Sequence, residues 1–348
     1  MSRHVISEAQ SDVSTVLVGR AMDDAVVASV AELAPQRVAV MCQPSTYGLA
    51  ESYAAMLATA GFEATGYTLP DGEEAKQIAV VEEVYRYLNS QSFTRSDVIV
   101  GVGGGALTDV AGFVGGTYLR GIRAIYVPTT LLGAVDAAIG GKTGVNVDGK
   151  NLAGVFRHPE SVVIDIDTLE RLPLQQRIEG AAEAIKTGFI ADMTIVEAFE
   201  RDGIDVDLAL VVDRSVAVKV AVVNEDFTEH GRRAILNYGH TVGHAIETST
   251  GRSHGTSVAI GMVAAGAAAA HLLGFDGQER QTAVLERVGL PLAAPEAKRE
   301  SVRALMALDK KRDAGGLRMV LLRDFARPEV VAVDDATVEA GLQAVGLA

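Results

Sequence analysis

Short β-branched runs alternate with longer helical patterns over about the first 155 residues of the chain. The strands predicted from these runs are 37–41, 62–67, 97–101 and 124–128, and helical patterns cover 47–60 and 73–88. This alternation is typical of βαβ units in a mostly parallel sheet. The run at 97–101 is nearly all apolar, as expected for a strand that is covered on both faces. We therefore predict an α/β domain over residues 1–155.

Helical periodicity dominates beyond residue 155, and strand-like runs become scarce after 162–166. Residues 258–270 are only Val, Ala, Ile, Gly and Met, so the helix predicted there has no polar face and should be buried among other helices. That stretch is too short to span a membrane. We predict an all-α second domain over residues 156–348. A cleft between the two domains is the default place for a ligand.

Composition and charge limit the classes of function. The 348 residues include 31 Lys and Arg against 45 Asp and Glu, a net charge of -14, which argues against broad nucleic-acid binding. The single cysteine, Cys42, excludes a disulfide framework and a multi-cysteine metal site, and suits a reducing compartment. The N-terminal residues lack the apolar core of a signal peptide. We expect a soluble cytoplasmic protein that binds neither nucleic acid nor membrane.

A glycine-rich turn follows the predicted buried strand at 97–101. The run from Gly101 to Asp109, GVGGGALTD, leads into a helical pattern, where backbone amides can approach a pyrophosphate. The run fits the G-x-G-x-x-A pattern only loosely, and no acidic residue lies about 20 positions further on to hold a ribose. It indicates a nucleotide site, with a tight turn that binds nothing as the alternative.

The strongest signal is the segment at 232–248, RRAILNYGHTVGHAIET. On a single helix its polar side chains share an arc of roughly 80°, opposite the apolar residues. These polar residues are Arg233, Asn237, His240, His244 and Glu247. Two imidazoles at positions i and i+4 can serve as paired metal ligands, or as one ligand and one acid/base group. A solvated polar face is the alternative.

A divalent ion that is held by nitrogen and oxygen atoms needs at least one further residue, and Glu183 and His254 are the best candidates. Glu183 lies among small apolar neighbours in GAAEAIKTG, with Lys186 one turn along the same face. A surface pair of these two residues is the alternative. His254 lies just before the predicted buried helix, where a capping role is the alternative. Three protein ligands with open positions describe a catalytic zinc-type site.

Cationic side chains recur where solubility does not require them. Lys142 and Lys150 flank a turn-rich stretch, and Lys219 interrupts the apolar run at 216–223. Together with Lys186, Arg233 and the pair Lys310 and Lys311, they could bind a small polyanion such as a phosphorylated acid. Each lysine alone could be a surface group, so this prediction depends on the whole set.

Taken together, these motifs resemble the 3-dehydroquinate synthases of the sugar-phosphate cyclase family. The resemblance covers nearly the whole chain. It runs through PDGEEAK at 70–76, GGGALTDVAGF, TYLRG, VPTTLLGAVDAAIGGKTGVN, GKNLAG, GAAEAIKTG, NYGHTVGHAIE, SHG and DKK at 309–311. It implies an N-terminal dinucleotide-binding α/β domain followed by a helical metal-binding domain, in a homodimer. The segments from Lys142 to Lys150 and from His244 to His254 are shorter than is usual in the family.

The resemblance also implies roles for single residues. Zinc or cobalt would be bound by Glu183, His240 and His254. NAD would be contacted by Glu73, Lys76, Gly104, Gly105, Asp109, Thr129, Thr130, Lys142 and Lys150. The substrate would be bound by Asp136, Lys142, Lys150, Asn151, Lys186, Lys219, Arg233, Asn237, His244 and either Lys310 or Lys311. Arg120 resembles an arginine that reaches the neighbouring subunit's phosphate site. Residues implied as catalytic are Lys142, Lys186, Lys219, Arg233, Asn237 and His244.

The implied reaction converts 3-deoxy-D-arabino-heptulosonate 7-phosphate into 3-dehydroquinate and phosphate, a lyase step of the shikimate pathway to aromatic amino acids. NAD would remove hydride from a secondary alcohol that the metal polarises, and the resulting ketone would acidify the adjacent carbon, so that phosphate leaves by elimination. The same NADH would return the hydride before ring opening and an intramolecular aldol addition. No second redox substrate is needed.

Three other functions remain as alternatives. A sister cyclase that makes an amino-dehydroquinate or a C7 cyclitol would share most of the motifs, although Arg233, Asn237 and His244 favour a carboxylated substrate. A metal-dependent alcohol or glycerol dehydrogenase of similar architecture would release NADH at each turnover and would have a pocket poor in lysine. A noncatalytic nucleotide-binding module would bind no metal.

Overall fold

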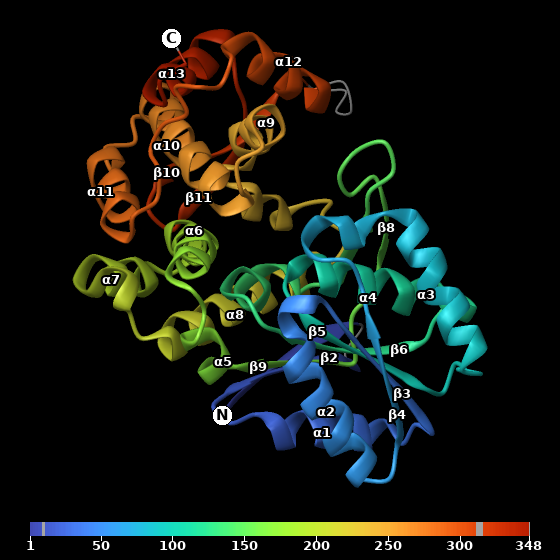
Figure 1. Ribbon diagram of the computed structural model, residues 1–348. Coiled ribbons are helices and arrows are strands. Elements are labelled where there is room, and N and C mark those ends of the chain that lie inside the picture. Colours follow the sequence, from blue (N-terminus) through green and yellow to red (C-terminus); the bar gives the residue numbers. More distant parts are fainter. Residues whose placement is uncertain (9–10, 311–315, 348) are drawn as a thin grey trace. The chain divides into compact units, whose positions relative to one another are not determined.

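The computed structural model describes residues 1–8, 11–310 and 316–347 (Figure 1). The chain divides into two units, one made of Met1–Leu172 with Lys219–Thr228 and the other of Pro173–Val218 with Glu229–Ala348. The first unit extends beyond the predicted boundary at residue 155. The reason is that the strand at Ser161–Asp165 pairs inside the sheet of that unit, where its backbone groups find their hydrogen-bond partners.

A seven-stranded sheet forms the centre of the first unit, in the order β1-β2-β9-β6-β5-β3-β4. Neighbouring strands are parallel except for β1 with β2. The strands are β1 (Ser2–Glu8), β2 (Ser11–Gly19), β3 (Arg37–Cys42), β4 (Glu63–Thr68), β5 (Val98–Gly103), β6 (Arg123–Pro128) and β9 (Ser161–Asp165). The mostly parallel α/β sheet is as predicted, and β1 and β2 are strands that the sequence pattern did not reveal.

Helices cover both faces of this sheet, which explains why β5 is apolar at almost every position. Helices α1 (Asp23–Leu33) and α2 (Tyr47–Thr59) lie on one face, and α3 (Ile78–Ser90) and α4 (Gly105–Thr117) lie on the other (Figure 1). Val26 of α1 and Leu57 of α2 are fully buried in one cluster with Val40 of β3 and Val100 of β5. A strand that is packed on both sides has no polar face.

Shorter elements complete the first unit. A hairpin of β7 (Lys142–Val145) and β8 (Ala153–Phe156) lies outside the main sheet. The others are η1 (Pro44–Thr46), η2 (Gly72–Lys76), η3 (Tyr118–Arg120), the π-helical turn η4 (Gly133–Ala137) and α5 (Ile166–Glu170). The helix predicted over 73–88 is thus two elements, η2 and α3, separated at Gln77, where the backbone is extended.

The second unit is mostly helical. Its helices are α6 (Leu174–Ala191), α7 (Met193–Asp202), the greater part of α8 (Leu208–Glu225), α9 (His240–Thr250), α10 (His254–Leu273), α11 (Gln278–Val288), α12 (Arg299–Lys310) and α13 (Asp335–Ala344), with the short η5 (Gly203–Asp205) and η6 (Arg232–Asn237). The unit also contains an antiparallel pair, β10 (Arg318–Asp324) and β11 (Arg327–Ala332). The prediction of an all-α domain therefore missed one two-stranded sheet.

Helix α10 is the core helix of the second unit. It is 20 residues long, longer than predicted, and its length and composition would allow it to cross a membrane, but 61% of its most apolar window is buried inside the protein. Small residues let neighbouring backbone approach it closely. A Cβ atom at Gly261 would lie 1.9 Å from the carbonyl oxygen of Gly239 and 2.8 Å from the amide nitrogen of Gly243. The start of α9 is thereby packed directly on α10.

We predict that Gly261→Ala destabilises the protein by about 3 kcal/mol or more, because the added methyl group meets rigid backbone rather than a side chain that can turn away. Thermal or denaturant unfolding followed by circular dichroism measures this change. The matched control is Gly48→Ala, an exposed position of α2 where a Cβ atom would meet nothing within 4 Å. That change should stabilise the protein by about 0.4–1 kcal/mol. Equal stability of the two variants would contradict the close approach at Gly261.

Candidate metal centre and nucleotide site

The histidine-rich segment at 232–248 is not one helix, as the sequence analysis assumed. Residues Arg232–Asn237 form the 3-10 helix η6, and α9 begins only at His240. Gly239 separates them with a φ of +79°, and a Cβ atom there would lie 2.7 Å from Met262 Cγ. The turn therefore requires glycine for its conformation and for its packing. Arg233 and Asn237 consequently do not continue the helical arc of His240 and His244.

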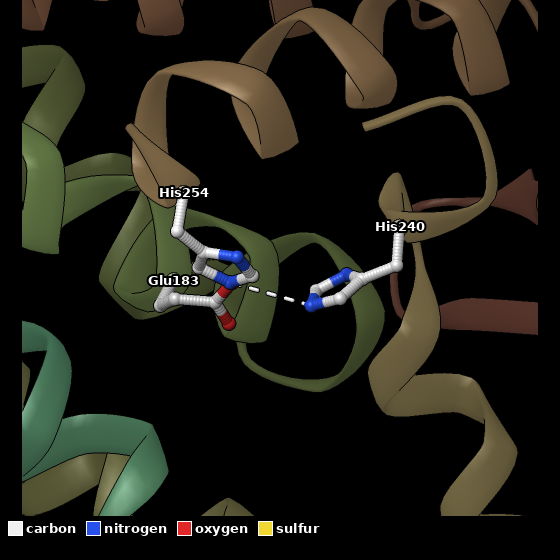
Figure 2. Close-up of side chains that lie close together, drawn as sticks. All are labelled: Glu183, His240 and His254. Carbon is white, nitrogen blue, oxygen red and sulfur yellow. Dashed lines mark ion pairs between the residues drawn. The ribbon is translucent and has the colours of Figure 1, made fainter. Parts of the chain in front are cut away.

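Glu183, His240 and His254 nevertheless lie together, as predicted, and they come from three different helices of the second unit (Figure 2). Glu183 lies in the middle of α6, while His240 and His254 are the first residues of α9 and α10. One ligand atom from each residue lies within 4.8 Å of the others. The Nε2 atoms of His254 and His240 are 3.3 Å and 3.5 Å from Glu183 Oε1.

The carboxylate of Glu183 is fully buried and carries its charge there. Its Oε2 atom accepts a hydrogen bond from Lys186 Nζ, one turn further along α6. Burial alone would raise the pKa of Glu183, but the positive charges of Lys186 and His254 outweigh it and hold the pKa well below its ordinary value. Among the described residues Oε1 has no hydrogen-bond partner. A buried, negatively charged oxygen that accepts no hydrogen bond is suited to binding a cation.

The two imidazoles differ in protonation. Burial, reinforced by Lys186, lowers the pKa of His240 to about 3, so this ring is neutral and can offer a lone pair. Burial would also lower the pKa of His254, but its contacts with Glu183 and Glu247 raise it to about 10. Without a metal, His254 therefore holds a positive charge between two carboxylates. A divalent ion would take over that role and release the proton.

Each histidine is oriented by a partner on its other ring nitrogen. His240 Nδ1 lies 3.1 Å from the carbonyl oxygen of Tyr238, and His254 Nδ1 lies 3.1 Å from Glu247 Oε2. A carbonyl or carboxylate in this position fixes the tautomer and leaves Nε2 for a metal. Both Nε2 atoms face Glu183, so the residues fit a divalent ion that is bound by two nitrogens and one oxygen.

A pocket of about 260 Å³ opens beside His240 within the second unit. Asn237, His244 and Arg318 line it together with His240. Asn237 and His244 are thus close to the metal ligands despite the break at Gly239. Arg318 belongs to β10, a strand that was not predicted from the sequence, and no sequence motif pointed to a role of Arg318 in the pocket.

In the first unit, the glycine-rich turn after β5 lies at the topological switch point of the sheet, where successive connections change from one direction along the sheet to the other. The chain leaves β3 through α2 on one face of the sheet and leaves β5 through α4 on the other face. Strands β3 and β5 are adjacent in the sheet. Ligands of open α/β sheets bind outside the carboxyl ends of the strands at such a point. Gly104 follows β5 there and is the N-cap of α4, with no capping side chain.

The glycines of this turn serve two purposes. A Cβ atom at Gly101 or Gly103 would lie 2.8 Å or 2.6 Å from side chains of α4, so these two glycines allow the helix to pack on the sheet. Gly104 and Gly105 instead lie at the start of α4, where first-turn amides lack partners within the helix and favour an anion. The pyrophosphate of a dinucleotide fits this position.

A polar network around the buried Lys76 lies next to the start of α4. Lys76 Nζ donates to Asp109 Oδ2 at 2.5 Å and also to Asn151 Oδ1. Asn146 joins the same network, because its side chain donates to Glu73 and accepts from the backbone amide of Asn151. Burial raises the pKa of Asp109 to about 6 in spite of Lys76. The sequence motifs pointed to all of these residues except Asn146.

The other predicted residues are divided between the two units. The first unit contains Arg120, Thr129, Thr130, Asp136, Lys142, Lys150 and Lys219. Lys219 Nζ donates to Asp136 Oδ1 at 2.5 Å. The second unit contains the buried Arg233. The side chain of Lys310 and the whole of Lys311 lie outside the described residues. That the residues of both units bind one substrate stays a prediction.

Comparison with known proteins decides the family. The model of the 3-dehydroquinate synthase N-terminal domain matches residues 66–179, and the model of the C-terminal domain matches residues 180–312. The chain belongs to the 3-dehydroquinate synthase family. It is 45% identical over 346 residues to the 3-dehydroquinate synthase of Thermobifida fusca, with 95% of this chain and 93% of that one covered. The corresponding enzyme of Streptomyces avermitilis is 42% identical over 346 residues, with 96% and 95% covered.

Solved structures similar to this member of the 3-dehydroquinate synthase family include two other cyclases. A 2-deoxy-scyllo-inosose synthase in complex with carbaglucose-6-phosphate, NAD⁺ and Co²⁺ has a TM-score of 0.87 and 26% identity, covering 99% of this chain and all of that one. The 2-epi-5-epi-valiolone synthase of Streptomyces hygroscopicus, with NAD⁺ and Zn²⁺ bound, has a TM-score of 0.88 and 25% identity over 98% of both chains. A probable glycerol dehydrogenase from Sinorhizobium meliloti, at 17% identity and a TM-score of 0.66, shares the fold.

We predict that Glu247→Gln weakens zinc binding about 10-fold, toward the lower end of the range for residues that orient metal ligands. The amide can still accept from His254 Nδ1 but no longer supplies a negative charge. Isothermal titration of metal-free protein with Zn²⁺ measures the affinity. Thr248→Ala, an exposed change on the same helix, is the control. If the Glu247→Gln variant binds zinc as tightly as the control does, the negative charge of Glu247 does not contribute to metal binding.

Proposed function

We propose that this protein is a 3-dehydroquinate synthase that converts 3-deoxy-D-arabino-heptulosonate 7-phosphate into 3-dehydroquinate and phosphate. The observation that carries the proposal is the convergence of Glu183, His240 and His254 in a chain that matches both domains of the family. The substrate class is a sugar phosphate, and the reaction is a phosphate-eliminating cyclisation. Relatives named 3-dehydroquinate synthase at 40–45% identity support this substrate over those of the two sister cyclases, which are 25–26% identical.

We assign NAD and one divalent ion, zinc or cobalt, as the cofactors of this protein. The two cyclase structures hold NAD⁺ with Co²⁺ or Zn²⁺, and the residues described above fit both groups. When bound, NAD supplies reversible hydride transfer and the metal ion supplies polarisation of an alcohol oxygen. Glu183, His240 and His254 would hold the ion. Gly104, Gly105 and the network of Lys76 and Asp109 would hold the nucleotide.

The cationic residues would bind the negative groups of the substrate. Lys186 and Arg233 are buried in the second unit, where a low dielectric strengthens their attraction for a carboxylate or phosphate. Lys219 is buried in the first unit and is held by Asp136, which fixes the direction of its ammonium group. These groups would also stabilise negative charge that develops as phosphate leaves. The ring of His244, at the pocket wall, can take up and return a proton.

We further propose that the protein acts as a homodimer in the cytoplasm. Arg120 would then reach the phosphate site of the neighbouring subunit. Leu119, next to Arg120, is 43% exposed, and Val147, Leu152 and Phe156 on the β7–β8 hairpin are also exposed. Exposed apolar side chains of this size suit burial against a second copy of the chain.

The deciding experiment incubates purified protein with the heptulosonate phosphate, a catalytic amount of NAD, and Zn²⁺ or Co²⁺. We expect one phosphate released for each 3-dehydroquinate formed, with no net accumulation of NADH, because the hydride returns within one turnover. Phosphate release and absorbance at the NADH band are followed together. Accumulating NADH would indicate a dehydrogenase instead, and turnover of only another sugar phosphate would indicate a sister cyclase.

We predict that Glu183→Ala and His254→Ala abolish both metal retention and activity, with metal affinity reduced by more than about 100-fold, since each change removes a ligand rather than its support. Metal content after dialysis and phosphate release are the measurements. Glu179→Ala, one turn earlier on α6, is the matched control. Glu183→Gln tests the same ligand with less loss of packing, because the amide keeps the side-chain volume and an oxygen that can accept from Lys186. Full metal retention in the alanine variants would show that the ligand assignment is wrong.

A further inference from the structure

A buried chain of hydrogen bonds connects α11 with the metal ligand His240. Gln281 of α11 donates from Nε2 to the carbonyl oxygen of Met262, at 2.5 Å. Its Oε1 accepts from the hydroxyl of Tyr238, at 2.7 Å. The carbonyl of Tyr238 in turn accepts from His240 Nδ1, at 3.1 Å. Gln281 is 1% exposed and Tyr238 is fully buried, so water does not compete for these bonds.

The two ends of the Gln281 amide cannot exchange places. The Met262 carbonyl can only accept, so it requires Nε2 of the amide, and Oε1 is then left to accept from the Tyr238 hydroxyl. The amide reaches Met262 because residue 266, one turn further along α10, is glycine. A Cβ atom at Gly266 would lie 2.9 Å from Gln281 Nε2. The sequence therefore leaves space on α10 at the place where this side chain docks.

Holding the ring of Tyr238 restrains its carbonyl group, which orients His240. Tyr238 has φ of -56° and ψ of 127°, and Gly239 follows with φ of +79°. This turn is packed against Met262 and Val258. With the ring anchored at one end and the turn at the other, the peptide plane of Tyr238 has little freedom to rotate. The direction of His240 Nε2 is set by that plane, through the bond at Nδ1.

Both proposed histidine ligands are thereby connected to the same helix, α10. His254 is the first residue of α10, and Met262, where the chain of hydrogen bonds ends, lies two turns further along it. A shift of α10 would move His254 directly and His240 through Met262, Gln281 and Tyr238. Such a closed connection would limit changes in the separation of the two Nε2 atoms.

We propose that Gln281 is a positioning residue for the metal centre. Through Tyr238 it fixes the tautomer and direction of His240, although its own side chain touches neither metal nor substrate. This inference rests on the metal site of the proposed function and adds a residue from α11, a helix to which nothing else assigns a role in that site.

The test uses the metal-free full-length protein and Co²⁺, whose visible absorption reports the geometry of its ligands. Gln281→Met replaces the amide by an apolar side chain of similar length, and Tyr238→Phe removes only the hydroxyl. We expect each variant to bind Co²⁺ about 10-fold more weakly than the wild type, with an altered cobalt spectrum. Gln278→Met, one turn earlier on the same helix, is the matched control and should bind as the wild type does.

The double variant Gln281→Met/Tyr238→Phe separates positioning from general destabilisation. If Gln281 acts through the hydroxyl of Tyr238, the double variant should bind Co²⁺ no more weakly than the weaker single variant. A loss that equals the product of the two single losses would overturn the proposal. So would wild-type affinity and spectrum in Tyr238→Phe, the least disruptive variant, whatever its melting temperature.

The same titration separates this inference from the proposed function. If the wild-type protein fails to bind Co²⁺, the metal site itself is wrong and both proposals fall. If the wild type binds Co²⁺ and both single variants bind it equally well, only the role of Gln281 is overturned.

Discussion

The second unit depends on the burial of one negative charge, the carboxylate of Glu183. No part of Glu183 reaches solvent, and an isolated carboxylate in such a place would cost several kcal/mol. Lys186 neutralises one oxygen from within the same helix, and two imidazoles from other helices face the second oxygen. Because the second oxygen has histidines rather than another ammonium group, the arrangement is suited to a cation that binds nitrogen as well as oxygen.

Close packing of helix backbones brings those histidines to the carboxylate. Helix α10 consists largely of alanine, glycine and valine, so α9 and α6 approach it until backbone atoms are nearly in contact. A Cβ atom at Gly255, next to His254, would lie 2.1 Å from the carbonyl oxygen of Glu179 on α6. The same small residues that make α10 look like an ordinary buried helix therefore determine where His254 and His240 lie. Stability and ligand geometry come from the same contacts.

The two units differ in the groups that they offer to a ligand. In the first unit, backbone amides at the start of α4 would provide the site, and glycine at the N-cap leaves them without a capping side chain. In the second unit, side chains would provide the site: the two histidines are held by acceptors, the Tyr238 carbonyl and the Glu247 carboxylate, and Glu183 is held by the donor Lys186. Backbone amides suit a pyrophosphate that many nucleotides share, whereas oriented side chains select one ion and one geometry.

The sequence alone was sufficient to predict the parallel sheet and the mostly helical second half, and with the family resemblance to choose His240 it predicted that Glu183, His240 and His254 lie together. Strand and helix periodicity is local, and carboxylate and imidazole groups are visible in the residue type. It could not reveal the break at Gly239, the strand that bears Arg318 or the contact of Gln281 with Tyr238. Those features depend on which backbone atoms of distant segments come within a few ångströms of one another, and only the tertiary structure decides that.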